Sequence, residues 1–128
     1  GLSYSNFVYS NLKIAQEGNT KDAVIKLSIN LSNKSEVDGE EVVQVYFRDE
    51  FSSITRPVKE LVAYQRVFVE SGQSIPVEFS IPLEALSYFD AGMKTVVEAG
   101  EFTFMVGGSS ADTNLIKASH LVKSDFIY

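Results

Sequence analysis

Residues 39–69, GEEVVQVYFRDEFSSITRPVKELVAYQRVFV, decide the fold because they predict two long β-strands joined by a polar loop. In residues 41–48 apolar side chains alternate, and every second position from Val43 to Phe47 faces the same way. Residues 61–69 are similarly rich in apolar and β-branched side chains. Successive side chains of a strand point to opposite faces, so this alternation is typical of half-buried strands.

The second side of both strands is also apolar, which a strand with one solvated side does not need. Val42 and Tyr46 lie on that side of the first strand, and we expect Val62, Tyr64 and Phe68 near or on it in the second. A strand that is apolar on both sides usually has both sides covered. We therefore expect an exposed apolar and aromatic patch here, which a neighbouring domain covers in a larger protein.

The rest of the chain predicts further short strands separated by turns. They are expected at residues 11–15, 23–31, 75–81, 94–97, 100–106 and 115–122, with one helical turn within 82–90. Pro76 cannot donate a backbone hydrogen bond, so its strand is expected at a sheet edge. Seven or eight strands without a helical period predict an all-β, two-sheet sandwich of the immunoglobulin or fibronectin type III kind.

The first ten residues differ in character from the rest. Tyr4, Phe7 and Tyr9 stand among serines and asparagines, which is typical of a linker pinned down by aromatic rings. An edge strand with aromatic anchors explains the same pattern equally well. We assign residues 1–10 to a linker from a preceding domain and residues 11–128 to the sandwich.

The composition excludes several classes of partner. The formal net charge of −6 argues against binding to nucleic acid and to anionic membrane surfaces. The chain has no cysteine, so it has no disulfide framework and no thiolate chemistry. It begins at Gly1 without a methionine or a signal-like segment, and we expect it to be a piece cut from a longer chain.

No residue pattern predicts catalysis, a metal or a cofactor. His120 is the single histidine, so neither a catalytic triad nor a multi-histidine zinc site can be built, and a rim position is expected for it. The carboxylates of residues 36–41 and 49–50 fall in turns and at strand ends, without the spacing of a calcium loop. Residues 107–110, GGSS, are followed by a predicted strand, so a hairpin turn is favoured over a phosphate-binding loop.

The loop at residues 49–59, DEFSSITRPVK, has two interpretations. Arg56 is a fixed positive charge among acids, and a structural loop held by Arg–carboxylate bonds would explain it. Phe51 and Ile54 are apolar residues in a loop, which favours a contact with another domain or protomer. The candidate contact residues are Val42, Tyr46, Phe51, Ile54, Arg56, Val62, Tyr64 and Phe68.

Five segments resemble the C-terminal fibronectin type III-like domain of glycoside hydrolase family 3, which includes β-glucosidases and β-xylosidases. In chain order they are GLSYSNFVYSNL, GEEVVQVYFRD, SSITRPVKELVAYQRVFVESGQS, IPLEALSYFD and VVEAGEFTFMVGGSS. The most specific block is EEVVQ at residues 40–44 followed by TRPVKEL at residues 55–61. Ala99 stands where the family's Pro-Gly-Glu-Phe block has proline.

The resemblance implies a protein of three parts. The catalytic aspartate and the acid/base glutamate would lie on two preceding domains, so no residue of this chain is expected to be catalytic. The chain would then be a non-catalytic accessory domain that stabilises those domains. Its expected partners are the catalytic domains of the same chain and, in a dimer, a second copy of the parent.

Two alternatives stay open from the sequence. A carbohydrate-binding module would present coplanar aromatic rings, for which Tyr46, Tyr64, Tyr88 and Phe89 are candidates, although the chain lacks tryptophan. A stand-alone interaction domain is the other alternative.

Overall fold

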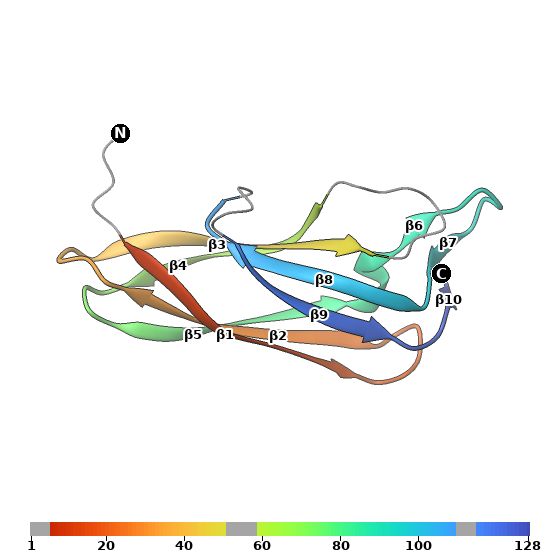
Figure 1. Ribbon diagram of the computed structural model, residues 1–128, viewed down its shortest axis with the longest axis horizontal. Coiled ribbons are helices and arrows are strands. Elements are labelled where there is room, and N and C mark those ends of the chain that lie inside the picture. Colours follow the sequence, from red (N-terminus) through yellow and green to blue (C-terminus); the bar gives the residue numbers. More distant parts are fainter. Residues whose placement is uncertain (1–5, 51–58, 110–114) are drawn as a thin grey trace.

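The computed structural model describes residues 6–50, 59–109 and 115–128 and is a β-sandwich (Figure 1). One sheet has the order β1-β2-β5 and the other the order β4-β3-β8-β9, and all pairings are antiparallel. A small third sheet, β10-β7-β6, lies at the end where the C-terminus is found. The predicted all-β sandwich is confirmed. Among the described residues, no helix has the length and apolar character needed to cross a membrane.

The elements follow the predicted segments closely. In chain order they are β1 (Phe7–Glu17), β2 (Val24–Asn33), β3 (Gly39–Asp49), β4 (Glu60–Val69), β5 (Ser74–Pro82), η1 (Leu83–Leu86), β6 (Tyr88–Phe89), β7 (Thr95–Val97), β8 (Gly100–Gly107), β9 (Ile116–Val122) and β10 (Phe126–Ile127). The two-residue strands β6 and β10 were not predicted. They are too short to show an alternation of their own, and pairing with β7 defines them.

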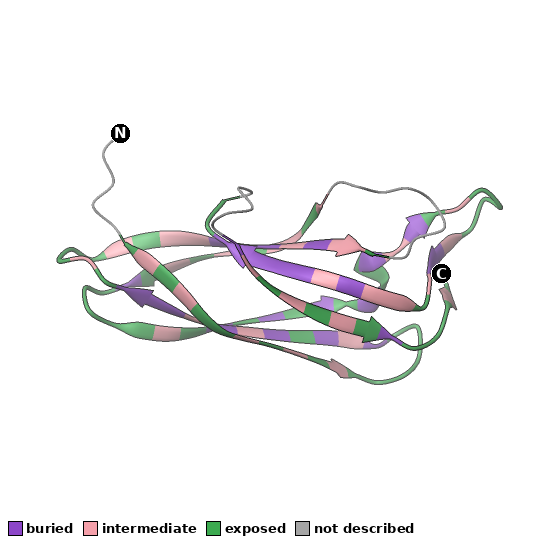
Figure 2. Ribbon diagram, viewed as in Figure 1, coloured by how far each residue is buried: buried purple, intermediate pink, exposed green. Residues whose placement is uncertain are grey.

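The core lies between the two larger sheets, as the alternation predicts. Figure 2 shows buried positions alternating with half-buried or exposed ones along β2 and β5. In β5 the side chains of Val77, Phe79 and Ile81 are buried and the residues between them are exposed. Pro76 lies on that exposed side, and β5 pairs with β2 alone among the described strands, so the predicted edge position is confirmed.

The first strand begins earlier than expected. Residues 7–10, which we assigned to a linker, pair with β2 from Phe7 opposite Asn33 to Ser10 opposite Asn30. The strand is interrupted at Asn11, whose φ of 56° shifts the register before pairing resumes at Lys13. This irregularity hides the strand from a simple alternation count, because it changes which residues face inward.

Polar bonds join the two sheets at their edges. The Tyr9 hydroxyl of β1 donates to Glu41 Oε2 of β3 at 2.8 Å, and burial together with this carboxylate raises the pKa of the phenol. At the opposite edge, Gln65 of β4 donates to the backbone carbonyl of Glu78 on β5. Such bonds satisfy polar groups that would otherwise be stranded at the rim of an apolar core.

Asn33 is a fully buried polar side chain at the end of β2. Its Nδ2 donates to the carbonyls of Val37 and Val69, each at 2.9 Å. Its Oδ1 accepts from the Ser35 backbone N–H at 3.0 Å and from the Ser35 hydroxyl at 2.7 Å. The side chain therefore ties β2, the turn before β3 and the end of β4 together. Although Asn33-Lys34-Ser35 matches a glycosylation sequon, this amide is already fully used.

We expect Asn33→Ala to lower the free energy of unfolding by about 2–4 kcal/mol, because it removes a fully buried side chain and leaves the Val37 and Val69 carbonyls without their donor, the Val69 carbonyl in a buried position. Urea denaturation of the purified chain measures the loss. Asn30→Ala is the matched control, because Asn30 is half-buried on the outer side of the same strand, and about 0.5 kcal/mol or less is expected. Equal losses for the two variants would contradict the role given to Asn33.

Candidate docking face

The outer side of β3 and β4 carries an apolar surface, as the two-sided strands predict. Residues opposite each other in an antiparallel pair share a side of the sheet, and here Tyr46 lies opposite Leu61 and Gln44 opposite Tyr64. We define the outer β3–β4 face as Val42, Tyr46, Leu61, Tyr64 and Phe68. Leu61, Tyr64 and Phe68 are 51%, 68% and 57% exposed, whereas Val42 and Tyr46 are half-buried.

A bulge decides which residue of β4 belongs to this face. The register shifts between Val45 and Tyr46, so that Ala63 pairs with Val45 but Leu61 pairs with Tyr46. Val62 lies between these two paired residues, at the register shift, and packs against the buried core. Unbroken alternation placed Val62 on the outer side with Tyr64, and that placement is wrong. Leu61 takes the position instead, and a bulge leaves no local signal in the sequence from which we could have found it.

Polar contacts border the apolar residues of the face. Arg66 Nη1 lies 3.4 Å from Glu40 Oε1, and both side chains are exposed. The Tyr46 hydroxyl donates to Gln44, whose Nε2 donates to the Gly108 carbonyl at 3.1 Å. Beside Tyr46, Met105 of β8 is fully buried even though its position in the strand puts it on the outer side. The centre of the outer side of this sheet is therefore less accessible to solvent than a fully solvated sheet surface would be.

The outer side of the β1-β2-β5 sheet provides a contrast. There Lys26, Ser28, Glu78 and Ser80 lie close together, and Lys26 Nζ donates to Ser80 Oγ at 2.7 Å. This is the alternation of a strand pair with one wet side. The two sheets thus turn chemically different outer surfaces away from a shared core.

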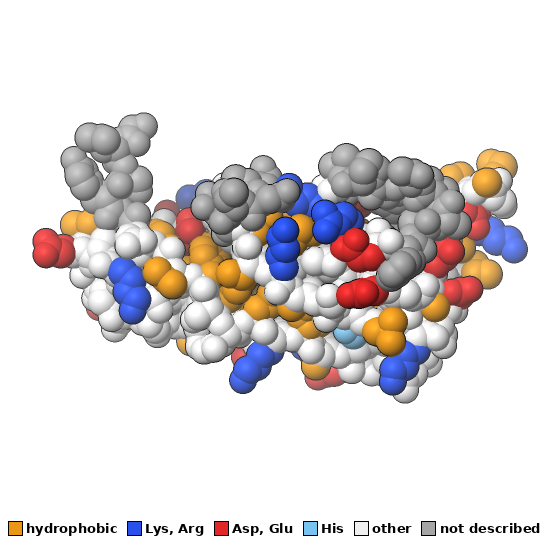
Figure 3. All heavy atoms as spheres, in the orientation of Figure 1, with side chains coloured by type: hydrophobic (Ala, Val, Ile, Leu, Met, Phe, Trp, Pro, Cys, Tyr) orange, Lys and Arg blue, Asp and Glu red, His pale blue; other side chains and the backbone are white. Residues whose placement is uncertain are grey.

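The structure does not bring the four candidate sugar-stacking aromatics together. Tyr46 and Tyr64 belong to the outer β3–β4 face, whereas Tyr88 and Phe89 lie on β6 at the end of the molecule. Tyr88 is buried and Phe89 is exposed, since neighbouring residues of a strand face opposite ways. Figure 3 shows hydrophobic side chains at that right-hand end, where Met93 at the tip of the β6–β7 hairpin is exposed.

Phe51, Ile54 and Arg56 lie outside the described residues. The adjoining carboxylate Glu50 accepts a hydrogen bond from Thr103 Oγ1 at 2.5 Å and lies 3.2 Å from Arg48 Nε. These contacts, led by the Thr103 hydroxyl, hold the pKa of Glu50 below its ordinary value. A general acid for glycoside hydrolysis needs a raised pKa, so Glu50 has the opposite character.

Two other acids have structural roles. Glu41 accepts from Tyr9, and Asp38 Oδ1 accepts from the Ser71 backbone N–H at 2.8 Å. Among the residues that the structure describes, no three His, Cys, Asp or Glu side chains are grouped to hold a metal ion.

His120 lies on β9, the strand at one edge of the four-stranded sheet, and its side chain is on the side that faces the core. Its Nε2 lies 2.8 Å from Gln16 Oε1 of β1, and its ring stands edge-on to Phe104 with centroids 6.5 Å apart. Burial lowers the pKa of the imidazole. The predicted rim position matches this half-buried place, where the ring contributes to the contact between the sheets.

The family model for the fibronectin type III-like domain matches residues 41–110. The chain belongs to this family. The matched residues run from β3 to β8 and so include the outer β3–β4 face. The predicted resemblance to this domain of glycoside hydrolase family 3 is confirmed by the relatives that follow.

Similar proteins are much longer enzymes. The fibronectin type III-like domain is 35% identical over 125 residues to thermostable β-glucosidase B of Acetivibrio thermocellus, covering 97% of this chain and 16% of that protein. It is 34% identical to a β-xylosidase of Formosa agariphila, covering 96% and 17%. The solved structure of β-glucosidase 3B from Thermotoga neapolitana superimposes with a TM-score of 0.88 at 32% identity, covering 100% and 17%. The domain therefore spans about a sixth of the length of these relatives.

The lowered pKa of His120 makes the stability of the domain depend on pH. The unfolded imidazole takes up a proton near its ordinary pKa of 6.5, before the folded one does. Protonation therefore favours the unfolded state, so this contribution is constant above about pH 6.5 and declines as the pH falls below it.

His120→Gln keeps a polar side chain beside Gln16 but cannot titrate. Below about pH 6.5, we expect the free energy of unfolding to fall more steeply for the unmodified domain than for this variant. The midpoints of urea unfolding at several pH values measure this difference. The effects of carboxylate titration on stability cancel in the difference, because both proteins carry the same carboxylates. Parallel pH profiles would contradict the prediction.

Proposed function

We propose that this fibronectin type III-like domain is a non-catalytic accessory part of a β-glycosidase, and that its outer β3–β4 face docks on the catalytic domains of the same chain. The observation that carries the proposal is the exposed apolar face itself. Leu61, Tyr64 and Phe68 are exposed on the same side of β4. Arg66 lies between the two aromatic residues on that side. The outer side of the other sheet is polar.

The size of the relatives supports a partner within the same chain. The domain corresponds to 16% of a β-glucosidase and 17% of a β-xylosidase, so most of each relative lies outside the matched part. Domain interfaces within a chain are moderately apolar with a polar rim. The outer β3–β4 face has this composition, with Arg66 and Glu40 beside the aromatic side chains.

The mechanism of an accessory domain is rigid docking. Burying Tyr64, Phe68 and Leu61 against a neighbour removes apolar surface from water at a gain of about 25 cal/mol per Å². The face is presented by two long paired strands backed by the core, so docking needs little ordering of the backbone. The parent thereby gains stability without any chemical step on this domain.

Docking predicts a difference between the domain alone and the parent enzyme. The variant Leu61→Ser, Tyr64→Ser, Phe68→Ser should leave the unfolding free energy of the isolated domain changed by little, because exposed side chains contribute little there. In the parent it should lower the melting temperature by several degrees and shorten the half-life of activity on heating. Differential scanning calorimetry of both proteins gives the comparison.

The matched control is Lys26→Ser, Glu78→Ser on the polar outer side, which should leave the parent unchanged. Equal melting temperatures for the parent and its triple variant would exclude docking through this face. If the triple substitution halves the mass of the parent measured by sedimentation, the face instead joins two copies. That result would support the homodimer that was expected as one possible partner.

The domain by itself should not hydrolyse glycosides. We expect no release of nitrophenol from aryl β-glucosides or β-xylosides above the rate of buffer alone, because Glu41, Asp38 and Glu50 accept hydrogen bonds within the domain. The pKa of Glu50 is also lowered, the opposite of what a general acid needs. Turnover that is lost when one of the domain's own acids is changed, as in Glu50→Gln, would overturn the proposal.

A further inference from the structure

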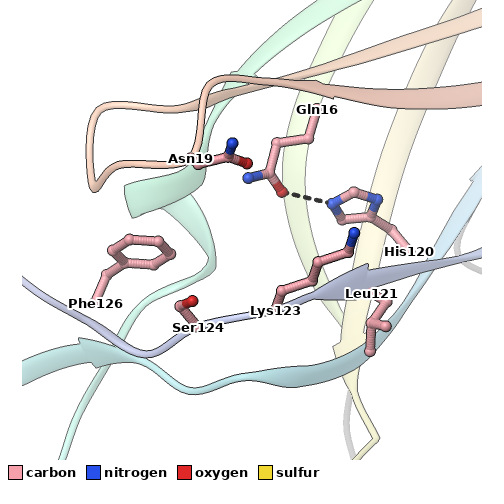
Figure 4. Close-up of a pocket in the computed structure, with 7 residues that line it drawn as sticks. All are labelled: Gln16, Asn19, His120, Leu121, Lys123, Ser124 and Phe126. Atoms are coloured by element: carbon pink, nitrogen blue, oxygen red, sulfur yellow. Dashed lines mark hydrogen bonds between the residues drawn. The ribbon is translucent and has the colours of Figure 1, made fainter.

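A pocket of about 440 Å³ opens at the edge of the sandwich where β1 and β9 end. Gln16 and Asn19 reach it from the end of β1 and the following turn, and His120 and Leu121 from β9. Lys123 and Ser124 line it from the segment after β9, and Phe126 from β10. Figure 4 shows the Phe126 ring at one end of the pocket and the His120 imidazole at the other. Its volume lies within the usual range for small-molecule sites, about 300–1,000 Å³.

Hydrogen bonds fix the orientation of two lining groups. Gln16 Nε2 donates to the Gly18 carbonyl at 2.9 Å, so its Oε1 is the atom that faces His120. His120 Nε2 must therefore donate its proton to Gln16 Oε1 across their 2.8 Å separation. In the neutral ring the proton is then on Nε2, which leaves Nδ1 as an acceptor. The direction of the pKa shift agrees with a neutral ring.

The lining combines donors, acceptors and one aromatic face. Asn19 and Ser124 can each donate and accept, and Lys123 donates. Phe126 supplies the aromatic ring. No carboxylate among the described residues lines the pocket, in a chain with 17 Asp and Glu against 11 Lys and Arg.

We propose that this pocket binds a neutral monosaccharide ring. Hydroxyl groups on a pyranose both donate and accept, which matches the mixed chemistry of Asn19 and Ser124. The C–H face of the ring is apolar and suits contact with Phe126. A small inorganic anion would use only the donors and would leave the aromatic ring without a role.

The chain has a larger concave surface that lacks these properties. It measures about 760 Å³ and lies on the outer side of the β1-β2-β5 sheet, where Lys13, Glu17, Lys26 and Glu78 bring charges of both signs. Phe79 also lines it, but its side chain is buried in the core and presents no ring. This surface therefore serves as an internal control for nonspecific binding of sugar.

The site is separate from the proposed docking role. It lies at the β9 edge of the four-stranded sheet, whereas the outer β3–β4 face lies at the other edge. Either proposal can fail while the other stands.

The test is to titrate the purified chain with D-glucose and with D-xylose. Two-dimensional amide proton–nitrogen NMR spectra, recorded at each sugar concentration, monitor binding. We expect shifts confined to the surroundings of Asn19, His120 and Ser124, with a dissociation constant on the order of millimolar. The double variant Asn19→Ala, Ser124→Ala should weaken binding about tenfold, because two exposed hydrogen-bonding groups are lost. Ser28→Ala, Asn30→Ala on the outer side of β2 should bind as the unmodified chain does.

Several outcomes would overturn the proposal. They are the absence of shifts with either sugar, shifts located on the outer β3–β4 face or the β1-β2-β5 sheet, and stronger shifts with phosphate or acetate than with sugar. Unfolding curves of both double variants verify that each is folded, and the residue-by-residue location of the shifts in the unmodified chain tests the site without any substitution.

Discussion

The packing of two sheets through a single apolar layer is the constraint on which this domain depends. Val43, Val45 and Phe47 of β3 and Ile25 and Leu27 of β2 are all buried within it. Because side chains alternate along a strand, filling this layer also determines what each sheet turns outward. The polar bonds at the edges, such as Tyr9 to Glu41 and His120 to Gln16, then close the layer where water would enter. The outer surfaces follow from the core, and the functional proposals concern those surfaces and edges.

The two outer surfaces have opposite chemistry for a physical reason. A sheet side that stays in water needs polar groups, as on β2 and β5, where lysine, serine and glutamate alternate with the core residues. A side that meets another protein surface gains from aromatic and aliphatic groups with a polar rim. Tyr64 and Phe68, with Arg66 between them in sequence, fit the second description. This difference supports a docking role more strongly than any single exposed residue, because isolated exposed apolar residues are common on monomeric proteins.

Chemistry on this domain is limited by how its charged groups are used. The carboxylates that the sequence grouped together are separate in function, since Glu41 accepts from a tyrosine, Asp38 from a backbone N–H and Glu50 from a threonine. Each of these contacts gives the carboxylate a fixed structural role. The pocket beside His120 differs because its lining is polar and almost uncharged. It is suited to hold a ligand by hydrogen bonds and has no group arranged to react with one.

The sequence by itself determined the strands, the inward-facing residues and the edge position of Pro76, because alternation and proline chemistry are local properties of the chain. It could not determine that Leu61 rather than Val62 faces outward, since a bulge arises from the pairing of β3 with β4. Nor could it show that Tyr88 is buried far from Tyr46, or that Gln16 orients His120 across 104 residues. Register and contacts between distant strands depend on the whole core being assembled, and so only the tertiary structure decided which surface is apolar and where a pocket forms.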